Sequence, residues 1–330
     1  MLLVPAAAAP SSFLTGRCCY GTARSAALIV GIREPRPTPT DLRGSRFLYL
    51  DNASASMPSL PPLARLREHV QALRARAHVP FSEAPTAAVL LLDDGRWIPG
   101  VRVESASYSL TLPAVLNAYT TAVAAGVADA VAAFVLSRPF RREEALYVKA
   151  LPQGPYEAVA DDAWLQGGWA GDGGALPPVD APLAPTLDHS SDNPAEGIGT
   201  AGGIDTARRA AQRAHVPASD YPVGAVLDLG DGRLVPGANV EHPDWARILC
   251  AERNALGTVQ SYGLPTPTRL FLTCAEDASG TPCGACRQLL AELAPDTTLW
   301  MDRCDEPPER TTVSALLPGS FRGQVLLDKA

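Results

Sequence analysis

Apolar and polar residues follow the same order of periods in two regions of this chain. In the first region, apolar positions at helical spacing over residues 61–77 precede an apolar run (AAVLLL), a DG turn and a second short run, RWIPGVRVE. Two such runs around a DG turn predict a β-hairpin. A further helix is expected from about Pro113, and a third strand at DAVAAFVL.

The second region repeats this order nearer the C-terminus. It has a helical segment at 205–214, with Asp205 as the expected N-cap, and a hairpin made of GAVLDL and RLVPGANVE. A helix is expected from about Cys250, a strand at TRLFLTC and an amphipathic helix at 283–293. Hairpin, helix, strand and helix in this order predict an α/β fold in α-β-α layers, with helices on both sides of a mixed central sheet.

A shift of 137 residues superimposes the two regions. From 78 to 127, 22 of 50 positions are identical without a gap, which indicates a tandem duplication. We expect a poorly organised segment at 1–56, a first domain at 57–150, a Gly- and Pro-rich linker at 151–203 and a second domain at 204–330.

Composition restricts the class of ligand. The net charge of -7 argues against binding to nucleic acid or to an anionic membrane surface, because phosphate groups attract clustered Lys and Arg. A small, roughly neutral substrate fits better. No run of 18 or more apolar residues occurs, so no membrane span is expected.

Cysteine usage bears on the compartment. The seven cysteines are odd in number, five of them lie from residue 250 onward, and two form CGAC, which favours metal chemistry in a reducing compartment over disulfides. We therefore expect a cytoplasmic protein. Residues 1–33 contain three arginines and no acid, as transit peptides do, so organelle targeting is the alternative, and an Ala-rich tail is the simpler explanation.

Three cysteines of the second copy predict a metal site. Cys283 and Cys286 are spaced to point the same way from a first helical turn, and Cys250 begins another helix. Three thiolates suit one Zn²⁺ and leave its fourth position for water. Glu252 would then sit beside that water as a proton carrier, and Arg253 is the nearest cation that could withdraw charge from the sulfurs.

The alternative is a closed structural zinc site with Cys274 or Cys304 as the fourth ligand. A closed site leaves no water to activate and has no use for the glutamate of the CAE motif. Cys274 ends an apolar run and is more simply explained as a buried strand cysteine.

Several short motifs around the cysteines resemble the cytidine deaminase family. They are NVE at 239–241, CAER at 250–253, PCGACRQ at 282–288, PVGA at 222–225 and LLPGSF at 316–321. The resemblance implies zinc-dependent hydrolytic deamination of cytidine and deoxycytidine to uridine and deoxyuridine, with release of ammonia, as in pyrimidine salvage. It also implies one Zn²⁺ per chain, in the second domain.

The resemblance further implies roles for single residues. A zinc-bound hydroxide would attack C4 of the pyrimidine, while Glu252 protonates N3 and then helps ammonia to leave. Asn239 and Glu241 would hold the ribose hydroxyls, and the backbone carbonyl of Thr281 would face the leaving amine. The remaining expected substrate contacts are Tyr221 and Ala251.

Two stretches depart from the family pattern. The family has an aromatic-Ser-x-Phe segment before PVG, where this chain has ASDY at 218–221, and a short Asn-Ala-like pair after NVE, where this chain has HPDW at 242–245. Another aminopyrimidine, such as a nucleoside antibiotic or a nucleotide, is therefore an alternative substrate. A non-catalytic scaffold stabilised by zinc is the alternative of a different class.

The first copy lacks the residues of this chemistry. The shift maps Cys250, Glu252, Cys283 and Cys286 onto Pro113, Val115, Leu146 and Lys149. In the family, active sites are completed by neighbouring subunits, so the expected partner is a second copy in a homodimer that imitates a four-domain assembly. In that assembly we expect Ser107 and Tyr108 to lean into a zinc site; the alternative is that Tyr108 only stabilises an interface.

Overall fold

The computed structural model describes residues 61–171, 175–188, 198–304 and 306–327, which belong to one compact unit beginning at Ser56. The expected N-terminal segment, 1–56, lies outside the described residues. Among the residues described, no helix combines the length and the apolar content needed to span a bilayer.

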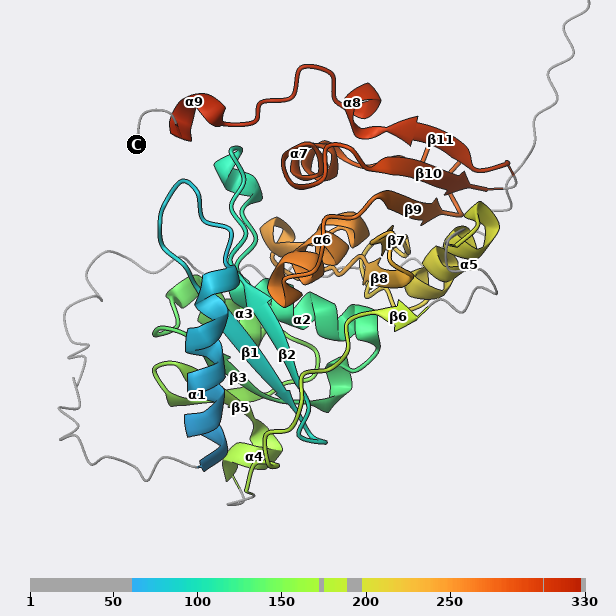
Figure 1. The fold of residues 1–330 in the computed structure, drawn as a ribbon. Helices are drawn as coiled ribbons and strands as arrows, with labels where there is room; N and C mark the ends of the chain where they lie inside the picture. Colours follow the sequence, from blue (N-terminus) through green and yellow to red (C-terminus); the bar gives the residue numbers. More distant parts are fainter. Residues whose placement is uncertain (1–60, 172–174, 189–197, 305, 328–330) are drawn as a thin grey trace, which may run out of the picture. The chain divides into compact units, whose positions relative to one another are not determined.

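The first domain is built on a sheet in the order β2-β1-β3-β5-β4 (Figure 1). Strands β1 and β3 are buried along their whole length because α1 packs against both of them and α2 packs on the sheet as well. The elements of this domain are α1 (Pro61–Leu73), η1 (Arg74–Arg76), β1 (Ala87–Leu92), β2 (Trp97–Val101), η2 (Tyr108–Leu110), α2 (Ala114–Ala125), η3 (Ala128–Ala130), β3 (Val131–Leu136), α3 (Arg142–Lys149), β4 (Tyr156–Ala160), β5 (Ala163–Gln166) and α4 (Gly167–Gly171).

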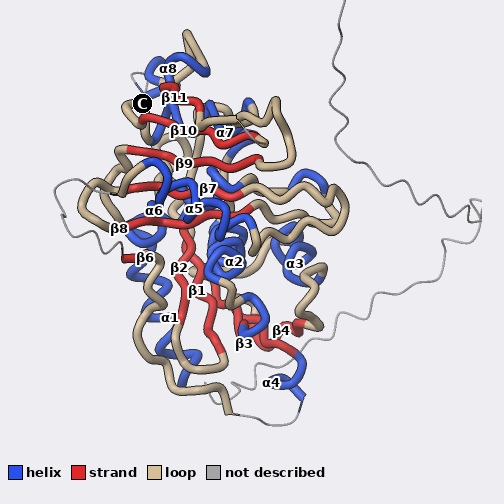
Figure 2. Tube along the Cα trace, turned by 90° about the vertical axis from the view of Figure 1, so that its right-hand side faces the viewer, coloured by secondary structure: helices blue, strands red, loops and turns tan. Residues whose placement is uncertain are grey.

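The second domain is built on a sheet in the order β11-β10-β9-β7-β8-β6, whose strands can be followed in Figure 2. Helices α5 and α6 both pack on β7, so this sheet too is covered by helices. The elements are β6 (Leu187–Asp188), α5 (Thr200–Ala211), β7 (Gly224–Asp228), β8 (Arg233–Ala238), η4 (Trp245–Arg247), α6 (Ala251–Tyr262), β9 (Arg269–Cys274), α7 (Gly284–Leu293), β10 (Thr298–Arg303), β11 (Glu309–Thr312), α8 (Val313–Leu316) and α9 (Gln324–Leu327). Helix α5 begins five residues before Asp205, with Gly199 as its N-cap, so the expectation of Asp205 as N-cap is wrong.

The two copies agree residue by residue in their first halves. The hairpins share one register, since Ala88 pairs with Gly100 and Ala225 pairs with Gly237 at the shift of 137. Helices α2 and α6 have equivalent bounds, and both end at a left-handed glycine. The duplication inferred from the sequence is therefore a duplication of structure.

The copies diverge after their third strand. In the second domain, β9 leads through α7 to β10, which pairs parallel to β9, so this sheet is mixed. In the first domain, β3 pairs antiparallel with β5, and all the described strand pairs of that sheet are antiparallel. The expectation of a mixed sheet thus holds for the second domain and not for the first, because the first has no parallel crossover.

The segment expected to be a linker contributes to both sheets. Residues 156–166 form β4 and β5 of the first sheet, where Trp164 is buried against β3. Residues 187–188 form β6, which pairs with β8 of the second sheet. The expectation of a linker over the whole of 151–203 is therefore corrected for these residues, which pair as strands; only β5 is buried along most of its length.

The contact between the domains is reciprocal. Helices α2 and α6 pack together, and the equivalent hydroxyls of Thr121 and Thr258 lie 2.8 Å apart. Arg76 of the first domain donates to the carbonyl of Ser261, and the equivalent Arg213 donates to the carbonyl of Ala124. A contact that repeats with its partners exchanged is the mark of two-fold related surfaces, here within one chain.

Candidate active site

Two helix N-termini bring three cysteine sulfurs together in the second domain. Cys250 is the N-cap of α6, Cys283 is the N-cap of α7, and Cys286 lies in the first turn of α7. The Cys283 sulfur is 3.6 Å from that of Cys250 and 3.5 Å from that of Cys286. Helix N-termini favour thiolates because their free N–H groups and dipole carry positive charge.

The spacing of these sulfurs fits a zinc ion. Tetrahedral Zn–S bonds of about 2.3 Å place two sulfurs roughly 3.8 Å apart. The three ligand atoms lie within 4.8 Å of one another, and Cys274 and Cys304 are not members of this group. The donor set therefore suits a three-cysteine site with one open position, rather than the closed four-ligand alternative.

The surroundings of the sulfurs favour a thiolate at Cys283. Hydrogen bonds from the thiols of Cys250 and Cys286, followed by the backbone N–H groups of α7, lower the pKa of Cys283. Cys286 is fully buried, whereas Cys283 is exposed and Cys250 is half-buried. A metal would thus be reached from the side of Cys283.

Glu252 lies on the first turn of α6 and is almost completely buried, with 3% of its surface exposed. Burial raises the pKa of the Glu252 carboxyl to about 7. The helix places this carboxyl at the wall of a cavity of about 230 Å³ that is also lined by Cys250 and Cys283. A buried carboxyl beside three thiols, open to a cavity, is an arrangement for moving a proton.

The same cavity collects most of the residues expected to contact substrate. Tyr221, Asn239, Glu241 and Thr281 all line it together with Glu252. It is also lined by residues that the sequence analysis did not single out for this role, namely Ser219, Val223, Ile248 and Cys274. Ser219 and Val223 belong to the ASDY and PVGA segments, so they could have been identified from these motifs. Ile248 and Cys274 belong to no motif that indicates a substrate contact.

Asn239 and Glu241 each hold the loop that precedes β7. The Asn239 amide accepts from the Val223 N–H at 2.8 Å and donates to the Tyr221 carbonyl at 2.9 Å. Glu241 Oε2 accepts from the N–H groups of Ala218 and Ser219. These bonds position the cavity wall, and the Ser219 side chain is a further hydrogen-bond partner of the Glu241 carboxylate.

Tyr221 points its hydroxyl away from the loop and donates to Asp277 at 3.0 Å. The Thr281 hydroxyl accepts a hydrogen bond from Arg287 at 3.1 Å. The Thr281 backbone carbonyl makes no hydrogen bond among the described residues. Ala251 is completely buried at the start of α6 and does not line the cavity. Of the expected substrate contacts, Ala251 alone lies outside the cavity lining.

Arg253 reaches the first domain instead of the sulfurs. Its Nη2 donates to the carbonyl of Leu110 at 3.0 Å, and its Nε is buried without a partner among the described residues. Arg253 therefore ties the segment around η2 to the helix that carries Cys250. Its expected role beside the sulfurs is not supported by a contact.

Ser107 and Tyr108 do not reach the cavity of their own chain. The loop that carries them is held to α7 because Glu292 accepts from the Ser105 hydroxyl and the Ala106 N–H. Tyr108 is 89% exposed, and neither residue lines the cavity. Within one chain, the structure therefore does not bring these two residues to the cysteines.

Comparisons with known proteins agree with this site. Residues 203–301 match the family described as "Cytidine and deoxycytidylate deaminase zinc-binding region", and residues 39–137 match a second family of the same description. The cytidine deaminase of Halalkalibacterium halodurans is 37% identical over 126 residues, covering 38% of this chain and 96% of that protein. The cytidine deaminase of Sporosarcina psychrophila is 35% identical over 119 residues, covering 36% of this chain and 88% of that protein. A crystal structure of cytidine deaminase from Burkholderia pseudomallei is 31% identical, covering 38% of this chain and all of that one, with a TM-score of 0.36.

Proposed function

Since this chain belongs to the cytidine deaminase family, we propose that it catalyses the zinc-dependent hydrolysis of cytidine and deoxycytidine to uridine and deoxyuridine, with release of ammonia. One observation carries the proposal: a single cavity is lined by Cys250 and Cys283 of the three-sulfur group and by the buried Glu252. A zinc-stabilised scaffold has no need of a proton carrier that faces an open cavity.

Cys250, Cys283 and Cys286 would hold the zinc ion in this proposal. When bound, zinc would act as a Lewis acid that lowers the pKa of the water it binds and makes that water a nucleophile near neutral pH. Glu252 would take a proton from the attacking water and deliver it to N3 of the pyrimidine, which favours attack at C4. It would then carry the proton of the new C4 hydroxyl to the amine, so that the C4–N bond breaks and ammonia leaves. The burial of Glu252 keeps bulk water away from that transfer.

The cavity wall would orient the nucleoside. Glu241 and the second N–H of the Asn239 amide would bind the ribose hydroxyls from this wall. The Thr281 carbonyl, which makes no hydrogen bond among the described residues, would face the leaving amine. Tyr221 would contact the base from the loop before β7. We assign no substrate contact to Ala251, since it is buried beneath the cavity.

The test is Glu252→Gln, which keeps the shape of the side chain and removes its proton chemistry. We expect the variant to bind zinc as the native chain does and its kcat to fall by a factor of about 10² to 10⁴. The ultraviolet change on cytidine, deoxycytidine and CMP measures turnover, and metal analysis measures zinc. Zinc binding without ammonia release from any of the three by the native protein would support the scaffold, and turnover of CMP alone would support a nucleotide substrate.

Glu104 offers a matched control for the role of Glu241. In the first domain Glu104 accepts from the N–H groups of Phe81 and Ser82, the equivalents of Ala218 and Ser219. Glu104 also accepts from the Ser82 hydroxyl and from Arg102, so Glu104→Gln should cost at least as much stability as Glu241→Gln, while only Glu241→Gln raises KM for cytidine. Equal effects of both variants on KM would show that Glu241 only holds its loop.

We further propose a homodimer that works in pyrimidine salvage in the cytoplasm. The exposure of Tyr108, on a loop anchored to α7, supports its insertion into the site of a second chain. Tyr108→Ala is expected to lower kcat/KM for cytidine in a protein that still elutes as a dimer. Unchanged kcat/KM in that dimer would leave Tyr108 a role in the interface only.

We place the end of the first domain near Gly171, the last residue of α4.

A further inference from the structure

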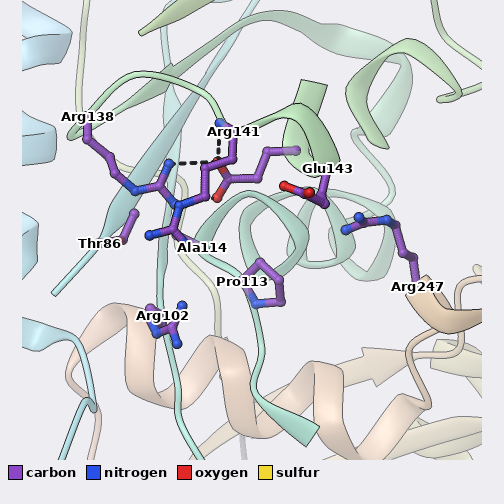
Figure 3. Close-up of a pocket in the computed structure, with 9 residues that line it drawn as sticks. Thr86, Arg102, Pro113, Ala114, Arg138, Arg141, Glu143 and Arg247 are labelled. Carbon is purple, nitrogen blue, oxygen red and sulfur yellow. Dashed lines mark hydrogen bonds and ion pairs between the residues drawn. The ribbon is translucent and has the colours of Figure 1, made fainter. Parts of the chain in front are cut away.

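The first domain has its own cavity at the place equivalent to the catalytic one. It measures about 310 Å³ and is lined by Thr86, Arg102, Pro113, Ala114, Arg138, Arg141, Glu143, Glu144 and Arg247 (Figure 3). The shift of 137 maps Thr86, Arg102 and Pro113 onto Val223, Asn239 and Cys250, all of which line the catalytic cavity. We call it the arginine pocket.

Hydrogen-bond donors in the arginine pocket outnumber acceptors. Among the described residues, the guanidinium of Arg141 makes no hydrogen bond or ion pair. Arg102 and Arg247 each bond a carboxylate through Nε alone, so their terminal amino groups keep their hydrogens free. The Nε of Arg138 is buried without a partner among the residues described. A guanidinium can only donate, so these groups call for an acceptor.

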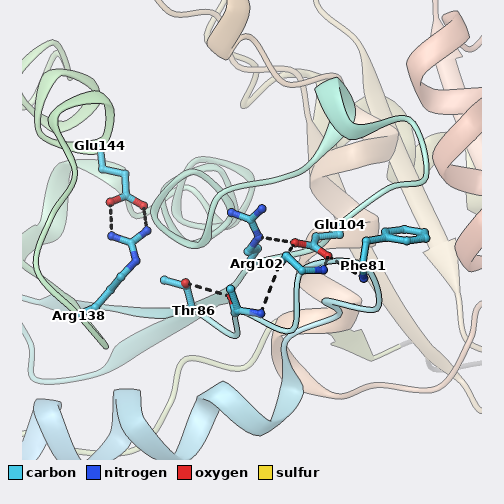
Figure 4. A network of polar contacts seen from close by, with 8 residues as sticks. Phe81, Thr86, Arg102, Glu104, Arg138 and Glu144 are labelled. Atoms are coloured by element: carbon cyan, nitrogen blue, oxygen red, sulfur yellow. Dashed lines mark hydrogen bonds and ion pairs between the residues drawn. The ribbon is translucent and has the colours of Figure 1, made fainter. Parts of the chain in front are cut away.

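The carboxylates nearby do not fill this need. Glu144 is already occupied by a two-bond pair with Arg138, at 2.8 and 2.7 Å, and Arg102 is paired with Glu104 at 2.9 Å (Figure 4). Glu143 is exposed and makes no ion pair among the described residues. Glu104 and Asp244 pair with Arg102 and Arg247 from beside the pocket, so an anion would be attracted by the unused N–H groups of the arginines and not by a net charge.

The start of α2 adds to the attraction for an anion. Pro113 and Ala114, its N-cap and first residue, both line the pocket. The first N–H groups of a helix have no partner within it, and the helix dipole makes that end positive. In the second domain the equivalent helix end meets three cysteine sulfurs, whereas in the first domain Pro113 stands in the place of Cys250 and brings no such acceptor.

We propose that the arginine pocket binds a phosphorylated small molecule. A phosphate group offers only acceptors and matches the paired N–H groups of arginine. The cavity volume leaves space for a small organic part beyond the phosphate, such as a ribose or a nucleoside. The ligand would join the two domains, because Arg247 belongs to the second domain and precedes Ile248, which lines the catalytic cavity.

Titration calorimetry on the full chain tests the proposal, with inorganic phosphate, ribose 5-phosphate and UMP as probes. We expect binding of at least one probe, weakened about tenfold or more by Arg141→Gln and also by Arg247→Gln. Arg141→Gln leaves the backbone N–H of that residue on Glu144, so α3 keeps its cap. Arg142→Gln is the control, since it removes the same charge from the next, exposed residue and does not line the pocket.

The three probes also identify the source of the phosphate. Phosphate binding as tightly as UMP indicates a site for the free ion, whereas tighter binding of ribose 5-phosphate or UMP indicates a sugar phosphate or nucleotide. The absence of binding by all three probes at millimolar concentration overturns the proposal. Binding that Arg141→Gln leaves as tight as Arg142→Gln does would place the ligand elsewhere and overturns it too.

Discussion

Gly237 and Gly100 form a pair of positions that separates the stability of the fold from the geometry of the candidate site. Gly237 lies in β8 beneath the first turn of α6, and Gly100 lies in β2 beneath the first turn of α2. A Cβ atom on Gly237 would lie 2.2 Å from the carbonyl oxygen of Ala251, and one on Gly100 would lie 2.2 Å from that of Ala114. The two copies thus contain the same close approach of strand to helix.

The size of the disturbance follows from these distances. Since Cβ atoms essentially never come within 3.0 Å of such a neighbour, Gly237→Ala must separate β8 from the start of α6 by at least 0.8 Å, the difference between 3.0 and 2.2 Å. That turn carries Cys250 and Glu252. Zinc–sulfur distances tolerate only about 0.2 Å, and a misplacement of about 1 Å can cost about 10²-fold in rate.

We therefore expect Gly237→Ala to lower kcat/KM for cytidine by about 100-fold and to weaken zinc retention. Both substitutions should lower the free energy of unfolding by a similar amount, about 1–3 kcal/mol, but Gly100→Ala should keep zinc and activity. Thermal denaturation, metal analysis and the ultraviolet assay on both variants give the comparison. Full activity of Gly237→Ala, or an equal loss of activity in Gly100→Ala at the same fall in Tm, would refute the reasoning.

Three further predictions concern the domain contact and the metal. Thr121→Val and Thr258→Val should each cost about 1–2 kcal/mol of unfolding free energy, and the double variant clearly less than their sum, because it removes both hydroxyls of one buried hydrogen bond. Urea denaturation measures this, with Thr258→Val plus Thr206→Val, whose hydroxyl bonds within α5, as the additive control. Cys283→Ser should lose zinc and activity, whereas Cys274→Ser should keep zinc, since Cys274 is not a member of the three-sulfur group. Metal analysis of both variants measures the zinc content. Loss of zinc in Cys274→Ser would support the closed site in which Cys274 is the fourth ligand. Chelation should lower Tm and abolish activity, and added zinc should restore both.

The sequence alone indicated the duplication and the centre of the candidate site. Period and turn residues are local properties, so the hairpins, α2, α6 and the helix that begins after Cys283 could be predicted from their own segments. The three cysteines and Glu252 could be selected because ligand chemistry restricts residue type and spacing within a first helical turn. The same argument singled out Asn239 and Glu241 only with the help of the family motif.

Only the tertiary structure decided how the segments pair and which distant residues meet. Strand β4 lies at the edge of its sheet with Glu157 and Ala158 exposed, so its sequence has no apolar run that would mark a strand inside the expected linker. Likewise, Arg247 of the second domain lines one cavity with Arg102 and Arg141 of the first, and Arg253 donates to the Leu110 carbonyl, because α2 and α6 pack together. Such meetings depend on how the sheets and helices bury their faces over long range, and no local spacing in the chain records that.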